Sequence, residues 1–205
     1  MNLRLHGSPM SRAFRCIWAL EELQLDFELV SVDFAKGEHL NNEFLSKNPM
    51  GKVPVLEVDG EFIFESAAII TYLANLKPEE NLIPEVTSLE YARCMQWLFF
   101  GMSELEQPLW TLAKHKFALP KELRTSEIKK AAFYEWEKAA QVVDTHLNDN
   151  QYMLGEQFSV ADIIVGQTLF WATKMEGAKI DYPNFKNYMK RLKTRERFPN
   201  IKKYL

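Results

Sequence analysis

Two serines and a cysteine lie close together near the start of the chain, in the stretch HGSPMSRAFRC at residues 6–16. Ser8 and Ser11 flank Pro9, and Cys16 follows further along. A serine hydroxyl can donate a hydrogen bond to an anion, and a cysteine thiolate is a nucleophile. Either serine could instead be a plain helix cap. No histidine and aspartate pair can be identified that would activate a serine nucleophile, so we expect a serine here to act as a hydrogen-bond donor.

A second polar pair, Glu65 and Ser66, precedes the apolar run AAIITYLANL, which predicts that Ser66 is a helix N-cap. Because a helix N-terminus has unpaired N–H groups and a partial positive charge, it can also hold a carboxylate. Glu65 would repel that carboxylate unless the ligand also carries a cation. The pair therefore suits a zwitterionic amino-acid head. Upstream, a cis Val53–Pro54 bond would free the backbone of Val53 to pair with an extended peptide, although cis is the minority form.

The elements that must position these residues begin with a short alternating strand around residues 3–5. From Arg12 onward the apolar residues recur at helical spacing, which predicts a helix with Cys16 on its apolar stripe. A cysteine buried in this way is inert. The same spacing places Arg12, Arg15 and Glu22 on the other side of the helix.

The next segment predicts more of a small α/β domain. Residues 27–34 alternate and are rich in β-branched residues, which predicts a strand, whereas residues 35–52 are polar and irregular. Residues 53–66 predict a hairpin that turns at Asp59-Gly60, since both positions of that turn take positive φ.

The chain changes character at residues 77–88, KPEENLIPEVTS, where two prolines and no periodicity predict a linker. Everything after the linker has a helical pattern. Two capping boxes are expected to open helices there: Thr87-x-x-Glu90 and Ser159-x-x-Asp162. The sequence therefore predicts an α/β domain at residues 1–78 followed by an all-helical domain at residues 87–205.

The composition excludes several classes of protein. The 205 residues have a formal net charge of −3, which does not suggest a binder of nucleic acid or of anionic membranes. The two cysteines form no CxxC motif, so neither a disulfide framework nor a metal site is expected. The first residues lack the apolar core of a signal peptide, and no apolar stretch is long enough to span a bilayer. We therefore expect a cytoplasmic protein.

The stretch NPMGKVPVLEVDGEFIFESAAIITYLA resembles the glutathione-binding half of the glutathione transferase family, and FSVADI resembles part of the family's helical second domain. The resemblance covers the whole chain. It implies a thioredoxin-like N-terminal domain, an all-helical C-terminal domain, a cis Val53–Pro54 bond, a site for the tripeptide glutathione, and a homodimer. A hairpin edge that carries Phe62 is the surface we expect a second subunit to cover.

The resemblance also implies roles for individual residues. It assigns Val53 to the cysteinyl backbone of glutathione, Glu65 and Ser66 to the γ-glutamyl group, and His39 and Lys52 to the glycine carboxylate. The thiol contact in this family is a tyrosine, serine or cysteine at the first helix. No tyrosine precedes Tyr72 and Cys16 is expected in the core, so a serine remains. PMS resembles the AMS stretch of phi-type members, which favours Ser11; delta-type members place their serine nearer the strand, which would be Ser8.

The function that follows is a serine-type glutathione transferase, active in detoxification, whose bound thiolate attacks a small hydrophobic electrophile. The electrophile site is expected between the domains, near Met10 and the helix MQWLFFGMSELEQPLW, although helical spacing favours a core role for its aromatic residues. Related alternatives are a glutathione-dependent dehalogenase, an isomerase or an ether-cleaving enzyme. An alternative of another class is a non-catalytic transferase-like module that binds a protein partner, for instance through the basic run at residues 186–203.

Overall fold

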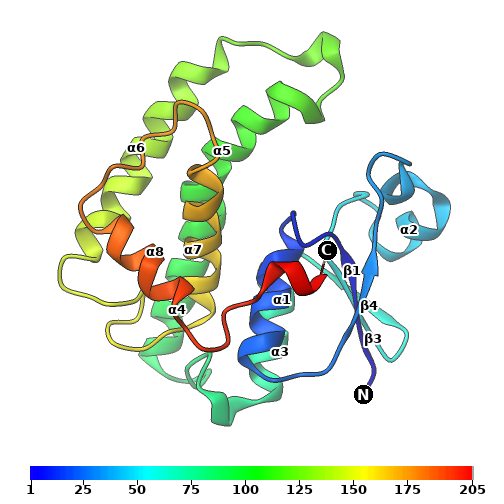
Figure 1. The fold of residues 1–205 in the computed structure, drawn as a ribbon, viewed down its shortest axis with the longest axis horizontal. Coiled ribbons are helices and arrows are strands. Elements are labelled where there is room, and N and C mark those ends of the chain that lie inside the picture. The colour runs from blue at the N-terminus through cyan, green and yellow to red at the C-terminus, as the bar shows by residue number, and fades with distance from the viewer. Residues whose placement is uncertain (205) are drawn as a thin grey trace. The chain divides into compact units, whose positions relative to one another are not determined.

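A computed structural model of the protein describes residues 1–204 and divides the chain into two compact units. The first unit comprises Met1–Ile83 together with the C-terminal segment from Arg195, and the second comprises Pro84–Thr194. The order is the predicted one, an α/β part followed by a helical part (Figure 1).

The first unit is built on one mixed sheet of four strands in the order β2-β1-β3-β4. The central strand β1 runs parallel to β2 and antiparallel to β3, and β3 is antiparallel to β4. The strands are β1 (Leu3–Gly7), β2 (Glu28–Ser31), β3 (Val55–Val58) and β4 (Glu61–Phe64). The predicted hairpin is confirmed: Asp59 and Gly60 have φ values of 49° and 95°, as a two-residue turn of this kind requires.

Two helices, α1 (Ala13–Glu22) and α3 (Ser66–Leu76), pack against each other in this unit. Leu5 of β1 and Leu56 of β3 are fully buried, as are Ile69 and Ile70 of α3. Burying side chains of this size contributes about 1.5–3 kcal/mol each. This core therefore fixes the start of each helix relative to the sheet.

Residues 35–52 contain a short helix that the sequence did not predict, α2 (Asn42–Lys47). Asn41 caps it by accepting a 2.7 Å hydrogen bond from the backbone N–H of Phe44. Phe44 is 5% exposed and packs with Val32 and Val55 in a small apolar cluster. Because only this side chain is buried on α2, the helix has no apolar periodicity that the sequence could display.

The helix α1 also differs from its predicted pattern. Arg15 and Glu22 were expected on the exposed side, but their exposed fractions are 0% and 5%. Glu22 accepts hydrogen bonds from Trp18 at 3.0 Å and from Arg195 at 2.7 and 2.8 Å. The C-terminal segment thus supplies the cation that the buried Glu22 carboxylate requires.

Further contacts hold the C-terminal segment in the first unit, where the sequence had placed it with the helical domain. Arg197 donates to Glu80 at 2.6 Å, and the ring of Phe198 lies 4.8 Å from that of Trp18 and 5.9 Å from that of Phe14. The segment ends in a 3-10 turn at Ile201–Tyr204. These contacts join positions far apart in the sequence, which helical periodicity does not reveal.

The second unit consists of five α-helices: α4 (Leu89–Phe100), α5 (Glu106–Ala113), α6 (Ile128–His146), α7 (Val160–Ala172) and α8 (Phe185–Lys193). A π-helical turn at Gly101–Leu105 joins α4 to α5. A Cβ at Gly101 would lie 2.7 Å from the Ile164 side chain, so glycine lets α7 approach closely. Within residues 1–204, no helix is both long and apolar enough to cross a membrane.

One of the two predicted capping boxes is confirmed. Ser159 caps α7, and the fully buried Asp162 accepts hydrogen bonds from the backbone N–H groups of Ser159 and Met153 and from the hydroxyl of Tyr188, at 2.8–2.9 Å. Burial raises the pKa of Asp162 to about 6, against the lowering effect of these donors. The Thr87 box is wrong, because α4 starts later.

The cap of α4 is Ser88, whose hydroxyl accepts from the backbone N–H of Tyr91 at 3.1 Å. A serine one residue after a threonine offers the same chemistry, so composition alone did not separate the two positions.

Candidate functional site

Ser11 lies in the turn between β1 and α1, directly before the helix. Its hydroxyl accepts a 3.1 Å hydrogen bond from the backbone N–H of Ala13 and donates one of 2.6 Å to the carbonyl of Ser8. Arg12 occupies the N-cap position without a side-chain cap. The half-buried Ser11 hydroxyl is thus the polar side-chain atom that meets the N-terminus of α1. A group held there can favour an anion by hydrogen bonding and through the helix dipole.

The hydroxyl of Ser8 makes a longer hydrogen bond in the same turn. Its hydroxyl accepts a 3.3 Å bond from the backbone N–H of Met10, and its carbonyl accepts from both the hydroxyl and the backbone N–H of Ser11. The Ser8 side chain therefore shapes the turn rather than the helix start.

Cys16 is fully buried on α1, as predicted, and burial raises the pKa of its thiol far above the ordinary range. Its nucleophilic thiolate form is therefore not populated at neutral pH.

The start of α3 differs in detail from the prediction. Glu65, not Ser66, occupies the N-cap position, and Ser66 is the first residue of the helix. Glu65 is exposed and has φ 71° and ψ 111°, a region that costs a non-glycine residue of order 1–3 kcal/mol. No side chain caps α3. The first N–H groups of the helix are therefore available to an anion.

Ser66 itself is 2% exposed, and its hydroxyl oxygen accepts a 3.2 Å hydrogen bond from Nη1 of Arg15. This contact joins α1 to α3. Arg15 is not among the predicted site residues, because helical periodicity places it on the exposed side of α1. The signal for its burial is its position directly before the apolar run that begins at Cys16.

Val53 and Pro54 lie next to the start of α1. The Val53–Pro54 peptide bond is cis, as the resemblance implied. A Cβ at Gly7 would lie 2.7 Å from the Cβ of Ala13, 3.6 Å from that of Val53 and 3.9 Å from Cα of Pro54. Glycine at the end of β1 thus brings the first turn of α1 against the Val53–Pro54 segment, since any side chain there would force them apart.

His39 lies in a 3-10 turn at Glu38–Leu40, and this turn contacts the loop that carries Lys52. A Cβ at Gly51, which has φ 60°, would lie 2.9 Å from the carbonyl oxygen of His39. His39 is half-buried against Phe34, with ring centroids 5.0 Å apart, and its Nδ1 is buried without a hydrogen-bond partner. Lys52 is exposed. Two basic side chains are therefore held on adjacent segments, and the Nδ1 of His39 can still make a hydrogen bond.

A separate ion-pair network lies on the sheet. His6 is 2% exposed and shares a 2.7 Å hydrogen bond with Glu57, which also pairs with Arg4 at 3.1 Å. Burial lowers the pKa of His6, and the hydrogen bond from His6 is the main cause that lowers the pKa of Glu57. The network satisfies polar groups on β1 and β3 and contains none of the predicted site residues.

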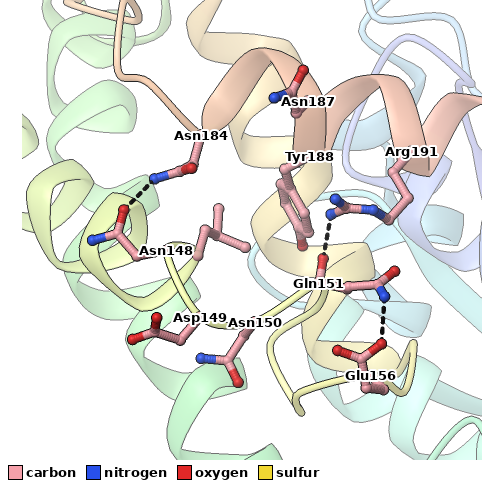
Figure 2. Close-up of a pocket in the computed structure, with 10 residues that line it drawn as sticks. Asn148, Asp149, Asn150, Gln151, Glu156, Asn184, Asn187, Tyr188 and Arg191 are labelled. Carbon is pink, nitrogen blue, oxygen red and sulfur yellow. Dashed lines mark hydrogen bonds between the residues drawn. The ribbon is translucent and has the colours of Figure 1, made fainter.

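The second unit has a polar pocket of about 350 Å³ (Figure 2). Asn184 faces Asn148, and Arg191 reaches the backbone carbonyl of Gln151 at 2.6 Å. Glu156 accepts from the side chain of Gln151. These polar groups bond to one another, and the pocket includes none of the predicted site residues. In the described part of the chain, no cluster of three or more His, Cys, Asp or Glu side chains could hold a metal ion.

The aromatic residues proposed for the electrophile site have mixed environments. Trp97 is 8% exposed and packs against Phe100 and His146, which is the core role considered for it. Phe99 and Met10 are each 64% exposed.

Comparison with known proteins identifies the class to which this fold belongs. Residues 1–75 match the model of the glutathione S-transferase N-terminal domain, and residues 102–196 match that of the glutathione S-transferase C-terminal domain. The chain belongs to the glutathione S-transferase family, and its fold is the thioredoxin-like and helical pair of domains that the sequence predicted.

Particular relatives are of two kinds. Glutathione S-transferase PARB of Nicotiana tabacum is 32% identical over 168 residues, which cover 80% of this chain and 78% of that protein. Elongation factor 1-gamma of Prunus avium is 32% identical over 206 residues, which cover 98% of this chain but only 48% of that protein. The chain therefore spans about half the length of this relative. A solved structure, glutathione S-transferase-I bound with lactoylglutathione, is 26% identical with a TM-score of 0.82 and full coverage of both chains.

Proposed function

We propose that the protein is a glutathione transferase that binds glutathione in its first unit and activates the thiol as a thiolate. The observation that carries the proposal is that the Val53–Pro54 segment and the start of α3 both contact α1, the helix that begins just after Ser11. Gly7 brings the start of α1 against Val53–Pro54, and Arg15 of α1 bonds to Ser66 at the start of α3. Glutathione needs such a site, because it is an extended peptide with a zwitterionic γ-glutamyl end.

In this proposal each part of the tripeptide has its own binding partners. The γ-glutamyl amine pairs with Glu65 and its carboxylate with Ser66 and the open N-terminus of α3. The cysteinyl backbone pairs with Val53. The glycine carboxylate lies near His39 and Lys52, and the orphaned Nδ1 of His39 supports this placement.

Ser11 then acts on the sulfur as a hydrogen-bond donor. A free thiol with a pKa near 8.5 is only a few per cent thiolate at neutral pH. Lowering that pKa by about two units requires roughly 2.7 kcal/mol of preference for the anion. A hydroxyl donor together with a helix N-terminus can provide this amount. The thiol proton passes to solvent water. The thiolate then attacks an electrophilic carbon, the carbon–sulfur bond forms as the bond from that carbon to the leaving group breaks, and the leaving group departs with the electron pair of the broken bond.

The test is isothermal titration of the purified chain with glutathione, followed by a panel of electrophiles that includes an aryl halide. We expect glutathione to bind and its conjugate to form. Replacing glutathione with cysteinylglycine, which lacks the γ-glutamyl group, should abolish measurable binding. Binding of glutathione no tighter than that of cysteinylglycine would contradict the proposed site.

A second candidate function is a non-catalytic module that binds a protein partner. The observation that favours it is the match of nearly the whole chain to one half of an elongation factor 1-gamma. Tight glutathione binding with turnover of no electrophile in the panel would favour this candidate. The presence of the whole set of Ser11, His39, Lys52, Glu65 and Ser66 supports the enzyme instead, because a module without catalysis does not need it.

We further propose a cytoplasmic homodimer. Phe62 and Phe64 of the edge strand β4 are 38% and 42% exposed, and a second subunit would remove this apolar surface from water. Light scattering should give about twice the 24.0 kDa mass of the chain. A monomer at micromolar concentration would contradict the dimer.

A further inference from the structure

A buried cation lies directly behind the proposed carboxylate site. Arg15 is fully buried in α1, and its Nη1 lies 3.2 Å from the hydroxyl oxygen of Ser66, the first residue of α3. A guanidinium at this depth must donate its hydrogen bonds to protein groups, and the Ser66 oxygen is one of its acceptors.

The direction of this hydrogen bond follows from the chemistry of the two groups. A guanidinium has only donors, so the Ser66 oxygen must accept from Arg15. A hydroxyl has a single proton, and the Arg15 bond does not use it. That proton therefore remains for an acceptor on the other side of Ser66, where the uncapped end of α3 presents its N–H groups.

Electrostatics favours the same kind of ligand. The N-terminus of α3 has a partial positive charge, and the guanidinium of Arg15 lies directly behind the Ser66 hydroxyl. Both effects increase the affinity of this position for a negative group. If the hydroxyl of Ser66 turned its proton inward, it would lose the Arg15 bond and present a lone pair to the ligand, which would repel a carboxylate.

We infer that Arg15 is a positioning residue that fixes the hydroxyl of Ser66 as an outward donor and thereby makes the start of α3 selective for a ligand carboxylate. The inference rests on the proposed function for the identity of that carboxylate, the one on the γ-glutamyl group of glutathione. Arg15 acts through Ser66 and does not itself contact the ligand.

The first experiment compares glutathione with its analogue γ-aminobutyryl-cysteinyl-glycine, which lacks only this carboxylate. The readout is the ratio of the two dissociation constants measured by titration calorimetry, since general damage to the fold weakens both ligands. We expect Arg15→Met to reduce the ratio roughly tenfold, the scale of one hydrogen bond to a charged group. Arg15→Lys, which keeps the charge and a donor, should restore part of it.

A matched control is Arg4→Met, which removes another arginine of the first unit, bonded to Glu28 and Glu57. The ratio should not change in this variant. In a Ser66→Ala background, Arg15→Met should have little further effect, because Arg15 acts through the hydroxyl. An unchanged ratio in both Arg15 variants would overturn the inference, and so would full additivity with Ser66→Ala, which would mean that Arg15 binds the ligand itself.

A second experiment needs no glutathione and separates the inference from the proposed function. The thiol introduced by Ser66→Cys should titrate below the free value near 8.5, since it lies beside Arg15 and the start of α3. Adding Arg15→Met should move this titration upward, whereas adding Arg15→Lys should largely retain it. The two natural cysteines do not interfere, because burial raises the pKa of both. If glutathione fails to bind the wild type but the titration depends on Arg15, the proposed function is wrong and the positioning role stands. If the pKa of the Ser66→Cys thiol is the same with and without Arg15, the positioning role of Arg15 is wrong.

Discussion

Removing the hydroxyl of Ser11 has two separable consequences. The first is structural: Ser11→Ala deletes the 2.6 Å bond to the Ser8 carbonyl and the 3.1 Å bond from the Ala13 N–H. The Ser8 carbonyl still accepts the backbone N–H of residue 11 at 2.9 Å, so of the two groups that lose the hydroxyl only the Ala13 N–H loses its hydrogen-bond partner altogether. The loss in free energy of unfolding should be about 1–2 kcal/mol, the range for losing a helix cap.

The second consequence falls on the bound thiol. If the hydroxyl and the start of α1 together provide about 2.7 kcal/mol of preference for the thiolate, losing the hydroxyl removes roughly half of it. The pKa of bound glutathione should then rise by about one unit. The value of kcat/KM should fall by about one to three decades, the scale for removing one stabilising donor.

The assay follows the ultraviolet absorbance of the thiolate in the complex with glutathione as pH is raised. Ser8→Ala is the matched control, because it loses only a 3.3 Å bond from Met10, and its titration should stay near that of the wild type. Ser11→Thr keeps a hydroxyl and should retain most of the activity. If Ser8→Ala abolishes the low-pH thiolate while Ser11→Ala leaves it intact, the assignment is wrong and Ser8 is the thiol contact.

Three other perturbations test the architecture around the site. Gly7→Ala would place a Cβ 2.7 Å from that of Ala13, so it should weaken glutathione binding at least tenfold while circular dichroism still shows a folded chain; unchanged affinity would refute the role of this close approach. Asp162 is expected to bind its proton more tightly in the folded than in the unfolded chain, with pKa values of about 6 and 3.8. The contribution of Asp162 to the free energy of unfolding is therefore complete below about pH 4 and decreases by roughly 3 kcal/mol as pH rises through 6. Urea unfolding at a series of pH values should show this decrease in the wild type and not in Asp162→Asn. Parallel pH profiles of the two proteins would contradict the expectation. Cys16 and Cys94 should react with a thiol reagent only on unfolding, because both are buried and burial raises the pKa of both thiols, that of Cys94 to about 11. Rapid labelling of the native chain would disprove their burial.

The features that the sequence predicted correctly are those whose cause is local. The Asp59-Gly60 turn depends on two residues that tolerate positive φ, and the Ser159 box on two side chains in one helical turn. The core position of Cys16 follows from the period of a single helix. None of these needs information from a distant part of the chain.

The features that it missed depend on distant partners. The buried Arg15 donates a hydrogen bond to Ser66, 51 positions along the chain, and the buried Glu22 pairs with Arg195, 173 positions away. A helical wheel assigns charged residues to the solvent side, since it contains no information about such partners. The helix α2 was missed for another reason: its burial rests on one phenylalanine, which leaves no period to detect.

The orientation of the Ser11 hydroxyl bears on the choice between an enzyme and a binding module. Its proton is bonded to the Ser8 carbonyl at 2.6 Å, so it must turn away before it can meet a sulfur. Turning leaves no acceptor unpaired, because the backbone N–H of Ser11 stays on the same carbonyl at 2.9 Å. The net cost of exchanging one hydrogen bond for another is therefore small, about 1 kcal/mol or less, and a bond to a charged thiolate exceeds it. A hydroxyl that can change partners at so low a cost is consistent with a donor that engages the sulfur only when glutathione is present, which is what the proposed activity requires.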